Sequence, residues 1–416
     1  MSKILIHTIA FSPDCVSTAY LYNDIALKFK EKGYEVVVLT TTPQYNVVKD
    51  ELIKQPLKRK LLGLYFESDF QGITVKHIPQ KKFKSSILRI LGFTFWHFAS
   101  FILGLFEKNI DIILSPSPPL TIGFINIVLG KLKDAKVIYN VQEIYPDLLI
   151  DGGGLKSKSI ISVLKWLEKF VYNYSDKVTT IDKIFYNTII NRFEDKTKLI
   201  IIPNFVDTSI YKPLSVNEID VDRDYFPKLE GSLKLMYAGN IGHAQDWDPL
   251  VEIAIQLRNE NIEFFIIGEG VMKEFIEKEI TLNKLTKVHI IPYQNRETIP
   301  SLIAYSDLQF IFMSPSMEGQ GFPSKVYTIM ACAKPMIVCS GSNTPIINFL
   351  KDKNCAYLIE EKDQNKKVIQ IVNLLKSIEK EDLKQLGKNG FNDININYSK
   401  EVVVELYLSL VHNYLK

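Results

Sequence analysis

Short hydrophobic runs rich in β-branched residues alternate with longer amphipathic segments along the chain. Such runs predict strands at 3–10, 34–41, 111–117, 136–143, 177–182 and 198–204, and again at 233–239, 262–268, 287–293, 308–314 and 335–341. Continuous apolar runs separated by helical segments are typical of parallel strands covered on both faces. The pattern therefore predicts an α/β protein with doubly wound parallel sheets.

The alternation is interrupted once, by a polar and acidic stretch around residues 215–232. A chain of 416 residues is too long for one ordinary hydrophobic core. We therefore expect two Rossmann-like domains. Ligands of such sheets lie at the carboxyl ends of the strands, so two domains that face each other imply a cleft between them.

Residues 87–106 form an unusually apolar segment that follows the basic residues 81–84. Three interpretations stay open for it. It is a helix buried on the first sheet, a helix lying on a membrane surface with its basic flank against anionic headgroups, or a membrane span.

Charge is distributed unevenly, although the net charge of +3 is too small to indicate nucleic-acid binding. The first 200 residues are net basic and the remainder is net acidic. A basic half favours an anionic partner, such as a phospholipid surface or a phosphorylated substrate. Cys15, Cys332, Cys339 and Cys355 form no CxxC pair, and we interpret them as buried thiols in a reducing cytosol. No signal peptide is evident, and we expect a cytoplasmic protein.

The stretch EGQGFPSKVYTIMACAKPMIV (318–338) predicts an anion site. Gly319 and Gly321 permit a close backbone approach, Ser324 is a favourable N-cap, and Lys325 falls in the first helical turn. A lysine there opposes the helix dipole unless both face one anion. The helix would bury Val326, Ile329, Met330 and Ala333. The alternative is a solvated lysine on an ordinary helix.

A second glycine loop follows the first strand of the C-terminal half. The sequence LKLMYAGNIGHAQDWDPL predicts a strand, the turn Gly239-Asn240-Ile241-Gly242, and a helix begun by Asp248. IIGEG contributes Gly268 at a further strand end. A plain tight turn is the alternative for each loop, but glycine loops at several strand ends together favour phosphate binding.

These motifs resemble the C-terminal domain of glycosyltransferase family 4. The resemblance rests on GNIGHAQ, IGEG, PYQNRETIPSLIAYSDL and GFPSKVYTIMACAKPMIV, in this order. The chain is most similar to the branch that includes bacterial N-acetyl-fucosamine transferases of O-antigen and capsule assembly. In the N-terminal half, FSPDCVSTAYLYNDIALKFKEKGYEVVVLTTTPQY, SPPLTIGF, NVQEIYPDLLIDGGGL and IPNFVD resemble further signatures of that branch.

The resemblance implies a GT-B fold, in which two Rossmann-like domains face each other across a cleft. It implies an acceptor-binding domain at 1–205, a donor-binding domain at 206–395, and a final helix at 396–416 that returns to the first domain. The donor nucleotide would be bound by Gly239, Asn240, Gly242, Gln245, Gly268, Tyr293, Gln294, Glu318, Ser324, Lys325 and Thr328. Asp14, Thr18 and Gln142 would face the acceptor, and the catalytic residues would be Lys325, Glu143 and His243.

The sequence also departs from the family pattern. Asn240, Gln245 and His243 stand where many members carry an Arg and a Lys, which leaves Lys325 as the firm cation for the diphosphate. Thr328 stands where a Glu usually grips the donor ribose, and Glu318 is a possible substitute. Glu143 stands where relatives show Asp.

The implied activity is a retaining transfer of a sugar, expected to be N-acetylated, from a UDP-sugar to a polyprenyl-diphosphate-linked saccharide. We expect the enzyme to be cytoplasmic and peripheral on the inner face of the membrane, with an anionic membrane surface as a partner and no nucleic acid. Two alternatives remain, a non-catalytic scaffold with a degenerate donor site and a sugar-nucleotide epimerase.

We expect no metal and no cofactor beyond the donor substrate. Asp220-Val-Asp222 and Asp246-Trp-Asp248 match a DxD string, but one lies in a connecting stretch and the other at a helix start. His7 ends a strand, and a structural role is favoured for it.

Overall fold

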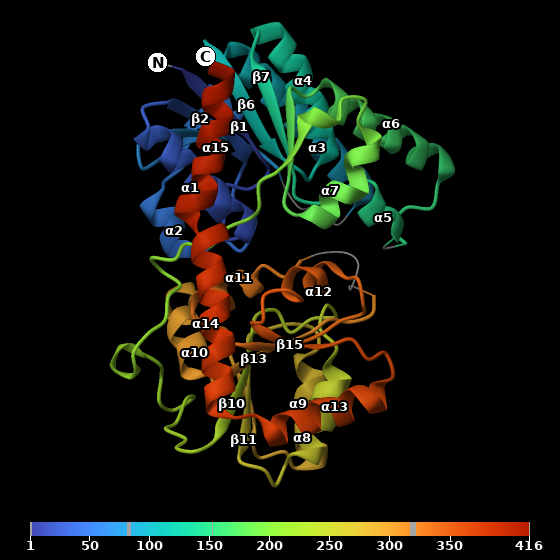
Figure 1. Cartoon of the computed structure of the whole chain (residues 1–416). Coiled ribbons are helices and arrows are strands. Elements are labelled where there is room, and N and C mark those ends of the chain that lie inside the picture. Colours follow the sequence, from blue (N-terminus) through green and yellow to red (C-terminus); the bar gives the residue numbers. More distant parts are fainter. Residues whose placement is uncertain (1, 81–84, 152, 317–321, 416) are drawn as a thin grey trace. The chain divides into compact units, whose positions relative to one another are not determined.

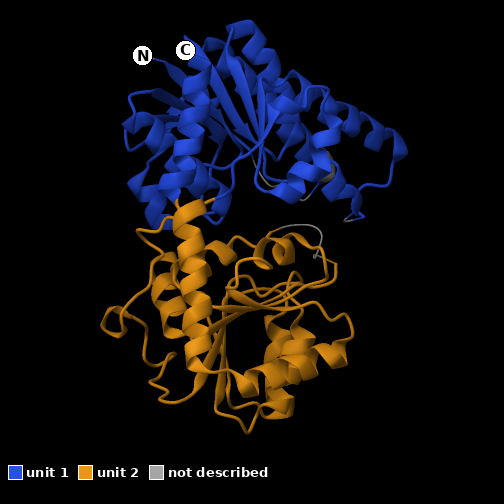
Figure 2. Cartoon of the chain, viewed as in Figure 1, with its two compact units in different colours: residues 1–204, 400–416 blue, residues 205–399 orange. Residues whose placement is uncertain are grey.

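The computed structural model describes residues 2–80, 85–151, 153–316 and 322–415. The chain forms two compact units, Met1–Asn204 with Lys400–Lys416, and Phe205–Ser399 (Figure 2). The domain limits expected from the sequence were 205 and 395. Each unit contains a mostly parallel sheet with packed helices (Figure 1), so the predicted α/β class is confirmed.

Unit 1 is built on a sheet of nine strands. They are β1 (Lys3–His7), β2 (Glu35–Thr41), β3 (Lys58–Lys60), β4 (Tyr65–Phe70), β5 (Ile73–Ile78), β6 (Ile110–Pro116), β7 (Lys136–Val141), β8 (Lys177–Thr180) and β9 (Leu199–Ile201). Their order is β3-β4-β5-β2-β1-β6-β7-β8-β9, and only β4 runs antiparallel to its neighbours. The sequence pattern missed β3, β4 and β5, because β3 is wholly basic and β4 is largely polar.

Eight α-helices accompany this sheet in the described part of unit 1. They are α1 (Ser17–Glu31), α2 (Lys49–Lys54), α3 (Ser86–Phe106), α4 (Leu120–Lys133), α5 (Asp147–Asp151), α6 (Lys158–Tyr174), α7 (Lys183–Ile189) and α15 (Lys400–Leu415). Helix α15, at the end of the chain, packs against α1 (Figure 1). Helix α4 packs between α3 and α6, so these three helices lie side by side.

Helix α3 corresponds to the apolar segment at 87–106, and none of the three interpretations describes it completely. In the described part of the chain it alone is long and apolar enough to cross a membrane, by length and composition only. Its second half packs on the sheet through Trp96, Ala99 and Leu103, all at most 5% exposed. Other residues along α3, including Ile90 and Phe98, are exposed. The basic residues 81–84 lie outside the described residues.

Unit 2 has a six-stranded parallel sheet in the order β12-β11-β10-β13-β14-β15. The strands are β10 (Leu233–Ala238), β11 (Ile262–Ile267), β12 (Val288–Ile291), β13 (Leu308–Phe312), β14 (Met336–Cys339) and β15 (Ala356–Ile359). The helices are α8 (Trp247–Gln256), α9 (Lys273–Asn283), α10 (Ile299–Tyr305), α11 (Lys325–Ala331), α12 (Pro345–Leu350), α13 (Gln364–Ser377) and α14 (Lys380–Asn397). The edge strand β15 was not predicted.

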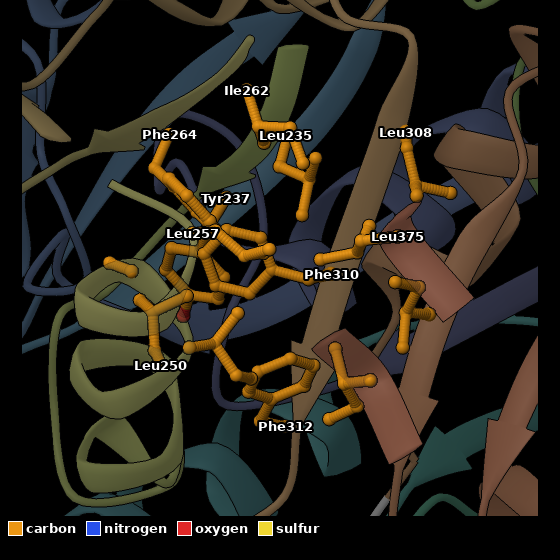
Figure 3. Packing of buried hydrophobic residues seen from close by; sticks show 14 of the residues in the cluster. Leu235, Tyr237, Leu250, Leu257, Ile262, Phe264, Leu308, Phe310, Phe312 and Leu375 are labelled. Atoms are coloured by element: carbon orange, nitrogen blue, oxygen red, sulfur yellow. The ribbon is translucent and has the colours of Figure 1, made fainter. Parts of the chain in front are cut away.

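Successive residues of β10 enter different hydrophobic cores, as expected for a strand covered on both faces. Leu235 and Tyr237 belong to one core, and Met236 between them belongs to another. Figure 3 shows Tyr237 within the first of these cores, near Phe310 of the adjacent strand β13. Tyr237 is 3% exposed and is the penultimate residue of its strand, so it links the core to the loop that follows.

Some local predictions were wrong. Helix α11 ends at Ala331, so Ala333 lies beyond it, at φ 53°, and is only half-buried. Ser324 is the N-cap residue of α11 as predicted, but its side chain makes no capping hydrogen bond. Helix α8 begins at Trp247 rather than Asp248. Cys332, Cys339 and Cys355 are buried as expected, but Cys15 is only partly so.

Candidate functional site

Three loops of unit 2 come together because β11, β10 and β13 are neighbours in a parallel sheet. Their carboxyl ends lie at one edge, where ligands of such sheets bind. The loop 239–242 follows β10, the loop 268–270 follows β11, and the chain after β13 leads to α11. The predicted residues Gly239, Gly268 and Lys325 are thus brought to one edge.

The two glycine loops touch through their backbones. Gly239 N donates to Ile267 O at 2.9 Å, and Ile241 N donates to Glu269 O at 2.9 Å. A Cβ atom on Gly268 would lie 2.0 Å from the carbonyl oxygen of Gly239, and Gly268 has a φ of 139°. Glycine at 268 is therefore required both by the close approach and by the backbone conformation.

Lys325 places its ammonium against this pair of loops. Its Nζ donates to the carbonyl oxygen of Ala238 at 3.1 Å and lies 3.6 Å from the centre of the Tyr237 ring. A Cβ on Gly239 would be 2.7 Å from the same Nζ. Burial lowers the pKa of Lys325 to about 7, because desolvation penalises the ammonium form. An anion at this place would restore the charged form.

Tyr237 and Trp247 hold the 239–242 loop. The Tyr237 hydroxyl donates to Asn240 O at 2.7 Å, and Trp247 Nε1 donates to Gly242 O at 2.9 Å. The two rings meet edge to face, 5.1 Å apart. The sequence interpretation missed Tyr237, although a tyrosine two residues before Gly239 was an available signal. Tyr237 fixes the position of both the loop and the Lys325 ammonium.

Several residues predicted to bind the donor nucleotide lie near Lys325, and they differ in exposure and in hydrogen bonding. Asn240 and His243 are exposed. Gln245 is buried, and its Oε1 accepts from Phe312 N at 3.0 Å, so its side chain ties the loop to β13. Gly242, the last residue of the loop, is buried, and a Cβ atom there would lie 2.7 Å from Asn240 Nδ2. Gln245 therefore supports the loop rather than replacing a cation.

The remaining donor residues lie on α11 and after β12. The Thr328 hydroxyl donates to Lys325 O at 2.9 Å, and Thr328 is half-buried. Ser324 is exposed at the start of α11. Tyr293 is 64% exposed, and Gln294 Nε2 donates to Pro292 O at 3.2 Å. Glu318 lies outside the described residues.

On unit 1, Asp14 holds a neighbouring loop. It is 2% exposed, and its Oδ1 accepts from Gln44 N and from Tyr45 N, each at 2.8 Å. A carboxylate bound to two backbone amides organises the loop. Thr18 is half-buried near the start of α1.

Gln142 and Glu143 follow β7. Gln142 forms a reciprocal amide pair with Asn204, with both distances at 2.9 Å, and also donates to Asn140 Oδ1. The backbone amides of both residues donate to Ser117 Oγ. Burial raises the pKa of Glu143, and a hydrogen bond from Tyr145 opposes that rise. Glu143 is thus a partly buried carboxyl group on a well-ordered loop.

His7 is fully buried, and its Nδ1 lies 2.8 Å from Asn126 Oδ1. Burial lowers the pKa of His7 to about 4, so the structural interpretation is favoured. Of the DxD strings, Asp246 lies 3.7 Å from Lys367, and Asp222 accepts from the amide of Asp224. Among the described residues, no three His, Cys, Asp or Glu side chains gather as metal ligands.

Comparison with known families assigns this edge to a class of enzyme. Residues 218–393 match the family described as "Glycosyl transferases group 1". This range contains both glycine loops and Lys325. This match, together with the two relatives described next, supports a glycosyltransferase enzyme.

Two curated proteins align with most of the chain. One is the Escherichia coli (strain K12) protein WcaI, named as a colanic acid biosynthesis glycosyl transferase, with 22% identity over 83% of this chain and 84% of its own. The other is WbjE of Pseudomonas aeruginosa, named as a glycosyltransferase, with 23% identity over 72% of this chain and 74% of its own.

Solved structures confirm the GT-B fold. A glycosyltransferase from Rickettsia africae ESF-5 superposes with a TM-score of 0.71, at 14% identity, over 100% of this chain and 99% of its own. Alr3699/HepE of Anabaena, determined in complex with UDP, superposes with a TM-score of 0.72, at 13% identity, over 99% of this chain and 100% of its own.

Proposed function

We propose that the protein transfers a sugar from a UDP-sugar to a lipid-linked saccharide during assembly of a bacterial surface polysaccharide. The observation that carries this proposal is the Lys325 ammonium, which lies against the two glycine loops at the shared edge of β10, β11 and β13. A diphosphate fits this arrangement, because an ammonium and closely approaching glycine backbones both favour it.

The nature of the donor is supported by similarity. The structure of Alr3699/HepE was also determined in complex with UDP-glucose, and it superposes on this chain with a TM-score of 0.70. We infer a UDP-sugar for this protein as well. The finer assignment to glycosyltransferase family 4, and an N-acetylated sugar, rest on the resemblance of the sequence motifs to that family.

The chemistry we propose is departure of the UDP diphosphate with retention of configuration. The bond between the anomeric carbon and the β-phosphate oxygen breaks, and the acceptor hydroxyl oxygen bonds to that carbon on the same face. The hydroxyl proton passes to the departing phosphate oxygen. Lys325 stabilises the negative charge that develops there, which is electrostatic catalysis. Glu143 and His243 remain proposed participants, and no metal is required.

The acceptor and the location are further parts of the proposal. The sequence relative WcaI is named for colanic acid biosynthesis, and the structural neighbour WaaG is named for lipopolysaccharide biosynthesis. Together with the basic first half of the chain and the exposed apolar side chains of α3, these names favour a polyprenyl-diphosphate-linked acceptor. The protein would then act at the cytoplasmic face of the membrane as a peripheral protein.

Calorimetry with UDP and product analysis with candidate UDP-sugars test this function. We expect UDP to bind, and Lys325→Ala to lower turnover by roughly 10²–10³-fold, as for loss of one transition-state donor. Lys278→Ala, which removes an exposed lysine on α9, serves as the matched control. Failure to bind UDP or any common UDP-sugar would favour the scaffold alternative, and consumption of donor without an acceptor would favour the epimerase.

A further inference from the structure

Helix α6 carries an aromatic and aliphatic stripe on its outer face. Ile160, Val163, Trp166 and Tyr174 are 51%, 61%, 60% and 55% exposed, and Phe170 is half-buried among them. Their spacing of three or four residues places all five on one side of the helix. The rings of Trp166 and Phe170, and those of Phe170 and Tyr174, stack at 5.6 and 4.4 Å. The stripe is thus an ordered surface.

The opposite face of α6 anchors the helix to unit 1. Val171 and Tyr172 are at most 1% exposed, and Glu168 is 3% exposed. Arg192 donates to Glu168 Oε1 and, through its other nitrogen, to Asp147 Oδ2 of α5, both at 2.5 Å. Helix α4 supports the stripe, because Phe124 packs on Phe170 with ring centres 5.5 Å apart. On the outer face, Ile160, Val163 and Trp166 are left exposed.

Most of the charge around the stripe is positive. The four lysines Lys156, Lys158, Lys165 and Lys169 are exposed, and the acidic residue within α6, Glu168, points inward. Lys169 lies 3.5 Å from Glu194. On α4, Lys131 lies 4.8 Å from the centre of the Tyr174 ring. Aromatic rings flanked by lysines are typical of helices that lie in the interface of an anionic bilayer.

We propose that the outer face of α6 docks on an anionic phospholipid bilayer, with the stripe from Ile160 to Tyr174 in the headgroup region. The fourteen intervals of helix between these residues span about 21 Å, which suits a helix lying parallel to the membrane. A bilayer fits better than a folded partner because the stripe is a convex helix face, and its lysines match anionic lipid headgroups. This inference deepens the membrane part of the proposed function and assigns it to α6.

The tryptophans of the chain provide a direct test. The chain has three, of which Trp96 and Trp247 are 0% and 3% exposed. Trp166 therefore reports contact with lipid. Full-length protein is mixed with vesicles of phosphatidylcholine and phosphatidylglycerol whose acyl chains carry bromine, which quenches nearby indoles. We expect quenching of Trp166, weakened by salt, and little effect with phosphatidylcholine alone.

Variants assign the signal to the stripe. Trp166→Phe should retain cosedimentation with the vesicles and lose the quenching. Val163→Ser combined with Trp166→Ser should lose cosedimentation. Lys165→Glu should weaken binding about tenfold or more, since each lysine near the surface contributes about fivefold. Lys388→Glu, an exposed site on α14, changes the net charge equally and should have no effect.

Three outcomes would overturn the inference. These are no binding to the anionic vesicles, binding without quenching of Trp166, and a dimer in solution that the double variant dissociates. Binding without quenching would assign the contact to another surface, such as α3. UDP affinity measured without lipid separates this inference from the proposed function. The α6 variants should keep that affinity, whereas a protein that does not bind UDP refutes the function and leaves the vesicle result standing.

Discussion

The ammonium of Lys325 lies 3.6 Å from the centre of the Tyr237 ring, and the hydroxyl of that ring donates to the carbonyl oxygen of Asn240. One buried side chain thus positions both the cation and the glycine loop that together form the proposed diphosphate site. A cation held over an aromatic face away from water is stabilised by about 2 kcal/mol. The ring compensates part of the cost of burying the ammonium.

Removal of the Tyr237 ring should therefore weaken donor binding. Tyr237→Leu is expected to lower UDP affinity by about tenfold or more, and Tyr237→Phe by less, because the phenylalanine keeps the ring and loses only the hydrogen bond. Calorimetry with UDP measures both effects. Phe310→Leu is the control, because Phe310 packs 5.7 Å from Tyr237 in the same core. Equal losses of UDP affinity in Tyr237→Leu and Phe310→Leu would show a general packing effect.

Donor binding should depend on pH through Lys325. Burial lowers the pKa of Lys325 to about 7, and a bound diphosphate favours the ammonium and raises this pKa again. Above about pH 7, UDP binding should therefore take up a proton, and affinity should fall as the pH rises. Calorimetry at about pH 8 in buffers of different ionisation enthalpy measures the uptake. Uptake that persists in Lys325→Met would assign the proton to another group.

The same pKa shift predicts the pH dependence of stability. Between about pH 7 and the ordinary pKa of lysine, the unfolded chain binds a proton that the folded protein lacks, so this contribution to stability rises with pH. The cost of the buried lysine is largest below about pH 7. Lys325→Met should therefore raise the melting temperature more at acidic than at alkaline pH, as thermal unfolding by circular dichroism can measure. A shift independent of pH would contradict the lowered pKa.

Gly268 should tolerate no side chain. Gly268→Ala would place Cβ 2.0 Å from Gly239 O at a φ of 139°. The backbone must then move, at a cost of about 2–3 kcal/mol or more. We expect a lower melting temperature and weaker UDP binding, because the displaced carbonyl belongs to the diphosphate loop. Gly154→Ala, whose Cβ would lie 3.6 Å from Leu149 O, is the control. Unchanged UDP binding in Gly268→Ala would show that the two glycine loops do not form the donor site.

The sequence pattern predicted the parallel strands well, because eleven buried hydrophobic runs mark them. It missed β3, β4, β5 and β15. The strands β3, β4 and β5 contain several polar residues, and β15 is an edge strand of only four residues. The pattern also indicated that Gly239, Gly268 and Lys325 share one edge of the sheet, because neighbouring parallel strands end at the same edge. The part of the site that depends on the backbone could therefore be predicted from the topology of the sheet.

Side-chain partnerships were the part that spacing did not predict. Gln245 was expected near the donor in place of a cation. The sequence did not predict that its side chain accepts a hydrogen bond from the amide of Phe312 in β13. The sequence also did not indicate that Asp14 accepts hydrogen bonds from two backbone amides of a loop thirty residues away. Both contacts depend on the register of distant segments, which a single sequence does not contain. Tyr237 was missed because a strand tyrosine usually only fills a core.

Thr328 offers a last test, on the ribose. Its hydroxyl donates to Lys325 O at 2.9 Å, so an oxygen lone pair remains to accept a hydrogen bond from a ribose hydroxyl. Thr328→Val keeps the shape and removes this acceptor, and a neutral hydrogen bond corresponds to a loss of about fivefold in affinity. Thr281→Val, which removes a hydroxyl bonded to Glu277 O on α9, is the control. We expect Thr328→Val to weaken binding of UDP but not of dideoxy-UDP. Equal weakening of both would mean that the substitution acts through Lys325, because the lost hydroxyl would then have had no ribose partner.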